Sequence, residues 1–65
     1  MKLQYLNTGE PAVYLGDNVF AIYLGGCVEL RENHAYDPSA CIRLELASVA
    51  VLVKFLKKAE KDDNS

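Results

Sequence analysis

The chain has 65 residues, 51% of them hydrophobic, and a formal net charge of −2. This length predicts a single domain, residues 1–65, close to the lower limit for a self-sufficient hydrophobic core. Chains of this size usually need disulfides, a metal ion or a partner to fold. No apolar run approaches 18 residues, so a transmembrane helix is excluded and no membrane partner is expected.

Disulfides and metal ions are poor candidates for this stabilising role. Cys27 and Cys41 are the only cysteines, and the N-terminal residues lack the apolar run of a signal peptide, so free thiols in the cytoplasm are expected. His34 and Asp37 do not form a close metal-binding pair with either cysteine. No metal ion or other cofactor is therefore expected, which leaves an oligomeric partner.

Short apolar segments alternate with turn-forming residues over the first two thirds of the chain. Enrichment in β-branched and aromatic residues predicts strands over residues 2–6, 12–15, 19–24, 27–32 and 40–46. Gly16-Asp17-Asn18 predicts a compact hairpin loop. Gly25-Gly26 is compatible with a two-residue hairpin turn, which we favour, or with a bulge in one long strand.

The last two predicted strands have clean alternation. Val28, Leu30, Ile42, Leu44 and Leu46 are expected to point inward, and the charged residues between them outward. Pairing Leu30 with Ile42 sets Glu29 opposite Arg43, whereas a shift by two residues would oppose like charges. The favoured register also sets Cys27 opposite Glu45 and Cys41 opposite Arg31, which argues against an intrachain disulfide.

Residues 47–61 predict a helix that is apolar around more than half of its circumference, followed by a frayed tail at residues 62–65. One stripe, formed by Val49, Leu52, Val53 and Leu56, is expected to cover the sheet. The predicted fold class is therefore α+β, with an antiparallel sheet of four to five short strands and one C-terminal helix packed across it.

A second apolar stripe on this helix needs another surface. Self-association would cover it, and a fold-over of the N-terminal segment is the alternative within one chain. Leaving such side chains in water forgoes roughly 1.5–3 kcal/mol for each large one. We favour a homodimer, with an interface formed by Val51, Leu52, Phe55 and Ala59.

Catalytic chemistry is not indicated. A Cys41–His34 pair is conceivable, but the sequence supplies no orienting partner or oxyanion hole, so no catalytic residue is predicted and a thiol-dependent enzyme is the least favoured reading. The charged residues of the last two strands are better candidates for contacts with a protein partner. These partner-binding candidates are Glu29, Arg31, Glu32, Arg43 and Glu45.

One resemblance adds to this reading. The segment Val28-Glu29-Leu30-Arg31-Glu32, a polar loop, and Ile42-Arg43-Leu44 leading into a helix resemble the end of the small single-strand-binding transcriptional coactivator family. The similarity covers about half of the chain. It implies a dimer formed through the helices and a sheet that binds single-stranded nucleic acid. That family has a basic sheet, whereas this predicted sheet carries more carboxylates than cations.

The sequence as a whole therefore predicts a small, non-catalytic interaction or regulatory protein that acts as a homodimer and binds a larger macromolecule. The alternative is a single-stranded nucleic-acid-binding protein, which the acidic sheet disfavours. It would use the aromatic side chains Tyr5, Tyr14, Phe20, Tyr23 and Tyr36.

Overall fold

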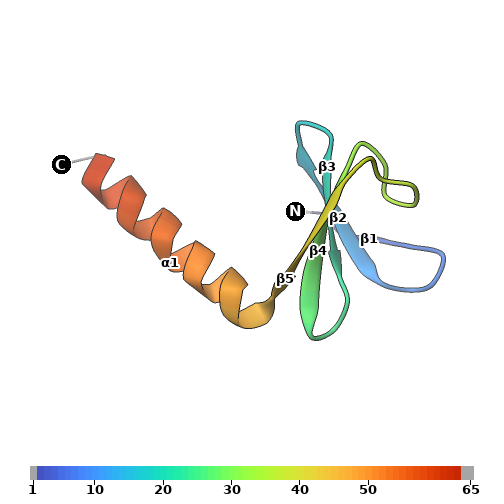
Figure 1. Cartoon of the computed structure of the whole chain (residues 1–65), viewed down its shortest axis with the longest axis horizontal. Helices are drawn as coiled ribbons and strands as arrows, with labels where there is room; N and C mark the ends of the chain where they lie inside the picture. Colours follow the sequence, from blue (N-terminus) through green and yellow to red (C-terminus); the bar gives the residue numbers. More distant parts are fainter. Residues whose placement is uncertain (1, 64–65) are drawn as a thin grey trace.

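The structure is a computed structural model that describes residues 2–63. It contains one antiparallel five-stranded sheet and one C-terminal helix, which confirms the α+β fold class (Figure 1). The strands follow one another in the order β1-β2-β3-β4-β5. The elements are β1 (Gln4–Tyr5), β2 (Pro11–Gly16), β3 (Val19–Tyr23), β4 (Cys27–Glu32), β5 (Cys41–Glu45) and α1 (Leu46–Asp63).

The helix starts one residue earlier than predicted and includes two residues of the predicted tail. The rest of that tail, residues 64–65, lies outside the described residues.

Both short hairpin turns have the backbone conformation that their residues favour. Asp17 and Asn18 have positive φ angles of 53° and 63°, as a type I′ turn requires at its two central positions. Gly25 has a φ of 96°, and the N–H of Leu24 donates a 2.9 Å hydrogen bond to the carbonyl oxygen of Cys27. Gly25-Gly26 is therefore a hairpin turn between β3 and β4, as favoured.

The predicted register of the last hairpin is confirmed. Leu30 pairs with Ile42, and Glu29 pairs with Arg43. Cys27 and Cys41 lie opposite Glu45 and Arg31, as expected, and both are free thiols.

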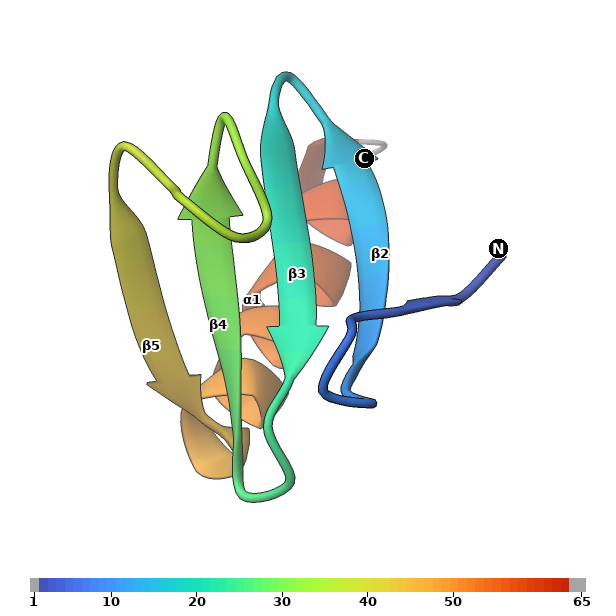
Figure 2. The same cartoon turned by 90° about the vertical axis from the view of Figure 1, so that its right-hand side faces the viewer.

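One face of the sheet is covered by loops, and we call it the covered face. Residues 33–40 cross it on the side opposite to the helix (Figure 2). A guanidinium N–H of Arg31 donates to the carbonyl oxygen of Ala35, and the backbone N–H of Asn7 donates to the hydroxyl oxygen of Tyr36 at 3.0 Å. Ile22 is 0% exposed on this face, and Ala12 beside it is also buried.

The helix is placed differently from the predicted packing. We expected one apolar stripe to lie across the sheet, but α1 contacts only β4 and β5 among the described elements. Val49 is the only half-buried residue from position 46 to position 62 of the helix, and the others are exposed. The helix follows β5 without an intervening loop residue and points away from the sheet (Figure 1).

The molecule is consequently elongated, with extents of 44 × 24 × 23 Å. Its radius of gyration is 13.4 Å, whereas a compact chain of this length has about 11 Å. Within the described residues, no helix is long and apolar enough to span a bilayer.

Candidate interaction surfaces

The sheet face opposite the loops is apolar and uncovered, and we call it the open face. The strand register places its side chains in two rows across the sheet, because paired residues share a face. None of these residues is buried, and Ile42 on the edge strand is 60% exposed. The rows consist of Val13, Ala21, Leu30 and Ile42, and of Tyr23, Val28 and Leu44.

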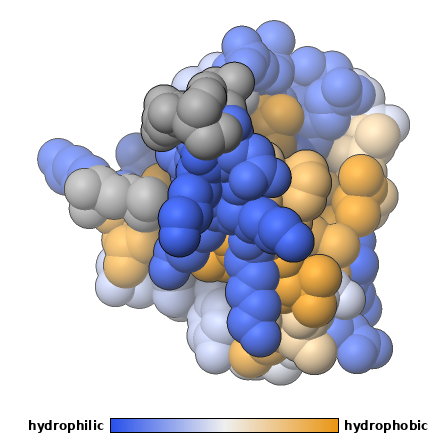
Figure 3. All heavy atoms as spheres, turned by 90° about the vertical axis from the view of Figure 1, so that its left-hand side faces the viewer, coloured by the Kyte–Doolittle hydropathy of each residue, from blue (hydrophilic) through white to orange (hydrophobic). Residues whose placement is uncertain are grey.

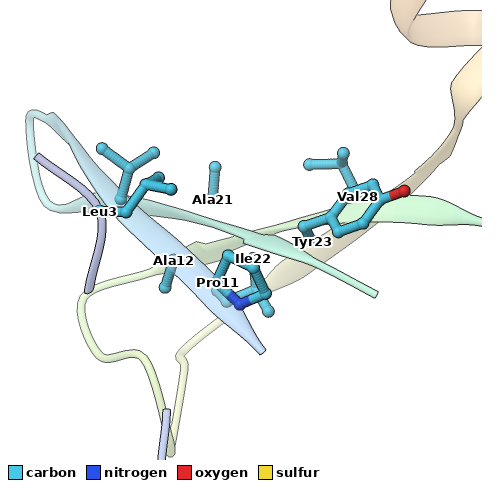
Figure 4. Close-up of a pocket in the computed structure, with 8 residues that line it drawn as sticks. Leu3, Pro11, Ala12, Ala21, Ile22, Tyr23 and Val28 are labelled. Carbon is cyan, nitrogen blue, oxygen red and sulfur yellow. The ribbon is translucent and has the colours of Figure 1, made fainter. Parts of the chain in front are cut away.

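Two hollows mark this face. The first has a volume of about 200 Å³, and its lining includes Leu3, Ala21 and Val28. In the close-up, Ala21 and Val28 project to one side of the sheet and Ile22 to the other (Figure 4). The second hollow, of about 210 Å³, includes Leu30 and Ile42 in its lining. Apolar cavities of roughly 150 Å³ can hold a benzene-sized ring, so either hollow has room for a large apolar side chain.

The helix presents a second apolar surface, which we call the apolar arc. At 100° per residue it spans about 200° of the helix circumference. Its apolar residues are Val49, Val51, Leu52, Val53, Phe55, Leu56 and Ala59, and the polar residues Ser48, Glu60 and Asp62 fall within the same arc toward the two ends of the helix. Val51 is 66% and Phe55 62% exposed. Apolar surface is visible next to the polar side chains of the helix when the molecule is viewed from that side (Figure 3).

The remaining arc of the helix is basic, and we call it the lysine arc. It contains Lys54, Lys57, Lys58 and Lys61. Four ammonium groups on one side of a helix strongly favour water on that side, because an unpaired charge is costly to bury. The helix can therefore be covered on its apolar arc only.

Glu29 is the centre of an ion-pair network on the covered face. Its carboxylate accepts a 2.8 Å hydrogen bond from Nε of Arg31 and a 3.0 Å hydrogen bond from Nη2 of Arg43. Glu29 is only 8% exposed, whereas the side chain of Arg43 is 65% exposed. The hydrogen bonds from Arg31 and then Arg43 hold the pKa of the Glu29 carboxyl below its ordinary value.

The predicted dimer-interface residues are all accessible on the helix. Val51, Leu52, Phe55 and Ala59 lie together on the apolar arc, and each is exposed. The N-terminal segment does not cover them, because α1 contacts neither β1 nor β2.

The predicted partner-binding residues are only partly brought together. Glu29, Arg31 and Arg43 form one network on the covered face, and Glu45 is exposed on that same face. Glu32 belongs to the opposite, open face because it pairs with Val19. Glu29 is buried, so it orients the two arginines and is not itself accessible to a partner. The accessible charged residues of this set are Glu32, Arg43 and Glu45.

His34, the histidine of the conceivable Cys41–His34 pair, lies in the loop between β4 and β5. Nδ1 of His34 accepts 3.1 Å hydrogen bonds from the backbone N–H groups of Tyr36 and Asp37, so this nitrogen organises the loop. Across residues 2–63, no group of three or more His, Cys, Asp or Glu side chains could hold a metal ion.

The sequence did not predict which face of the sheet the loops cover. The alternation of β4 and β5 is as predicted, but the face expected to point inward is the open face. The face that we expected to be exposed to water is the covered face, on which Glu29 and Ile22 are buried. Strand periodicity identifies two faces and their chemistry, whereas the covering of one face involves long-range contacts such as the hydrogen bond between Asn7 and Tyr36, 29 positions apart.

Comparison with protein families, with curated proteins and with solved structures gives no match to this chain. The function is therefore inferred from the geometry of the two apolar surfaces and the covered face.

Proposed function

We propose that this chain is a small, non-catalytic interaction protein that acts as a homodimer and binds a larger macromolecular partner. The observation that supports it is the pair of uncovered apolar surfaces, the open face and the apolar arc. Large contiguous apolar patches are rare on monomeric proteins and mark interaction sites.

The size of the covered core supports the same proposal. Ala12 and Ile22 are the only buried hydrophobic residues among those described. Ordering a chain of this length costs on the order of 100 kcal/mol of conformational entropy, which apolar burial must largely offset. A monomer with so small a core has little of that burial, whereas a dimer that covers both surfaces adds to it.

Size-exclusion chromatography with light scattering tests the homodimer. We expect a mass of twice the 7.2 kDa chain at tens of micromolar. A mass of one chain at that concentration would contradict the proposal.

The covered face and the strand ends remain available for the larger partner in such a dimer. Arg43 and Glu45 are exposed on the covered face, whereas Glu32, at the end of β4, lines the second hollow of the open face. Carboxylates exceed cations in the sheet region, so a basic protein surface is the complementary partner.

A charge variant tests this docking surface. We expect Glu45→Gln to reduce capture of a partner from native lysate by the tagged dimer. Asp17→Asn in the β2–β3 turn is the matched control, because it removes one carboxylate charge at the opposite end of the sheet from Glu45. Equal capture by all three proteins would count against an acidic docking surface.

Single-stranded nucleic acid is the second candidate, supported by exposed Tyr14 and Tyr36 together with exposed Arg43. Glu29 partly neutralises the arginines of this face, which weakens phosphate binding. Fluorescence anisotropy with labelled oligonucleotides at low salt separates the two candidates. Binding below tens of micromolar protein would favour the nucleic-acid reading, and its absence would remove it.

A further inference from the structure

The open face and the apolar arc point to one particular arrangement of the homodimer. We infer that the helix of each copy lies on the open face of the other copy's sheet, so that the two helices form a middle layer between two sheets. This inference rests on the proposed homodimer and specifies which surfaces meet.

The surface area of the chain supports a second copy as the occupant. The chain exposes 5220 Å², whereas a folded monomer of its mass exposes about 4,100 Å². The excess of about 1,100 Å² is somewhat larger than the roughly 800 Å² that each partner buries in a standard protein interface. One additional chain is therefore enough to bring the exposed area of each copy into the range of a compact protein.

The dimensions of the two surfaces are compatible. A helix of 18 residues is about 27 Å long, and a strand of six residues is about 20 Å long. The helix can therefore cross the strands obliquely over the whole open face. Its large side chains, Val51 and Phe55 in particular, are then available to enter the two hollows of that face.

The width of the apolar arc explains why two surfaces are needed. An arc of roughly 100° suffices for a helix that packs on one layer, whereas this arc spans about 200°. In the proposed middle layer, each helix contacts a sheet with one part of its arc and the other helix with the rest. The chain's own helix already contacts β4 and β5 near Val49, which orients it toward this layer.

The lysine arc limits the assembly to two copies. The four lysines of the arc must stay in water, so they line the outer sides of the middle layer and leave no apolar surface for a third copy. The contact is reciprocal, since each copy supplies one helix and one open face, as a closed two-fold dimer requires.

Isotope-filtered NMR on the wild-type protein tests the arrangement. Equal amounts of carbon-13-labelled and unlabelled chains are mixed, and contacts between labelled and unlabelled chains are recorded at a concentration where light scattering gives the mass. We expect cross-chain contacts from the ring of Phe55 to the methyl groups of Leu30 and Ile42. A dimer whose Phe55 contacts only the other helix would overturn this arrangement and leave the homodimer standing. A one-chain mass would overturn both.

A variant of the open face provides an independent measurement. Ile42→Lys lies on an exposed edge-strand position, so the sheet of the monomer should tolerate it. We expect its dimer dissociation constant to rise at least about tenfold, because a charge must then be buried in the interface. Glu45→Gln on the same strand but on the covered face is the control and should leave the constant unchanged. Unaltered dimerisation of Ile42→Lys would exclude the open face from the interface.

Discussion

Glu29 shows how a charged residue can belong to the core of so small a domain. Its carboxylate is nearly inaccessible, but Arg31 and Arg43 supply hydrogen bonds from two strands. A buried charge is tolerated only when such partners satisfy it. The network therefore joins β4 to β5 and sets the hairpin register that places Leu30 beside Ile42.

Substitution of Glu29 by Gln should destabilise the fold at neutral pH by about 1–2 kcal/mol, a moderate value because Arg43 is mostly exposed. Since the folded pKa of Glu29 lies below the unfolded value, its contribution is present above the unfolded pKa and is lost as the pH falls through the folded pKa. Urea unfolding at equal protein concentration, at neutral pH and near pH 3, measures the difference. Glu45→Gln is the control. A deficit of the variant that is as large in acid as at neutral pH would contradict this account.

At the scale of the elements, the β2–β3 hairpin depends on three consecutive residues with positive φ, Gly16, Asp17 and Asn18. Asn tolerates this conformation, whereas a β-branched side chain clashes with the backbone. Asn18→Val should therefore cost about 1–2 kcal/mol in the free energy of unfolding. Asn18→Gly should cost little, because Gly adopts positive φ freely. Thermal or urea denaturation measures both, and equal stability of the two variants would show that the turn geometry is not required.

The helix is the element whose stability depends most on other molecules. It has 18 residues, its β-branched Val49, Val51 and Val53 lower its helix propensity, and most helical stability in proteins comes from the packing of an apolar face. Packing on a second copy would stabilise it. Helical circular dichroism per residue should therefore fall on dilution, over the same concentration range in which light scattering shows dissociation. A constant signal through dissociation would mean that the helix is stable without the dimer.

At the scale of the whole molecule, the sequence predicts what each surface is made of but not which molecule covers it. Alternation in residues 27–32 and 40–46, with the Glu29–Arg43 pair, was sufficient to predict the two strands, the residues that share each face and the register, but not which face is covered. The position of the helix was not predictable, because an amphipathic pattern shows which side chains avoid water and not which surface receives them. The covering of the other face rests on long-range contacts such as that of Tyr36, for which the local sequence has no signal.

Phe55→Ala tests the molecule as an assembly. Phe55 is 62% exposed in the single chain, so the sheet itself should keep its structure and its stability as a monomer. In the dimer the substitution removes about 2 kcal/mol of apolar burial from each copy. Because each dimer contains two substituted copies, the dissociation constant should rise on the order of 100- to 1,000-fold. Analytical ultracentrifugation over a dilution series measures this constant.

Lys57→Ala is the matched control for Phe55→Ala, because Lys57 lies on the lysine arc of the same helix. Its dissociation constant should stay close to that of the wild type, since Ala preserves helix propensity and the position remains in water. If the helix forms the dimer through its apolar arc, substitution on that arc must weaken the dimer and substitution on the lysine arc must not. If both variants dimerise as the wild type does, the apolar arc is not part of the interface. If both weaken the dimer equally, the effect comes from the stability of the helix and not from contact with the second copy.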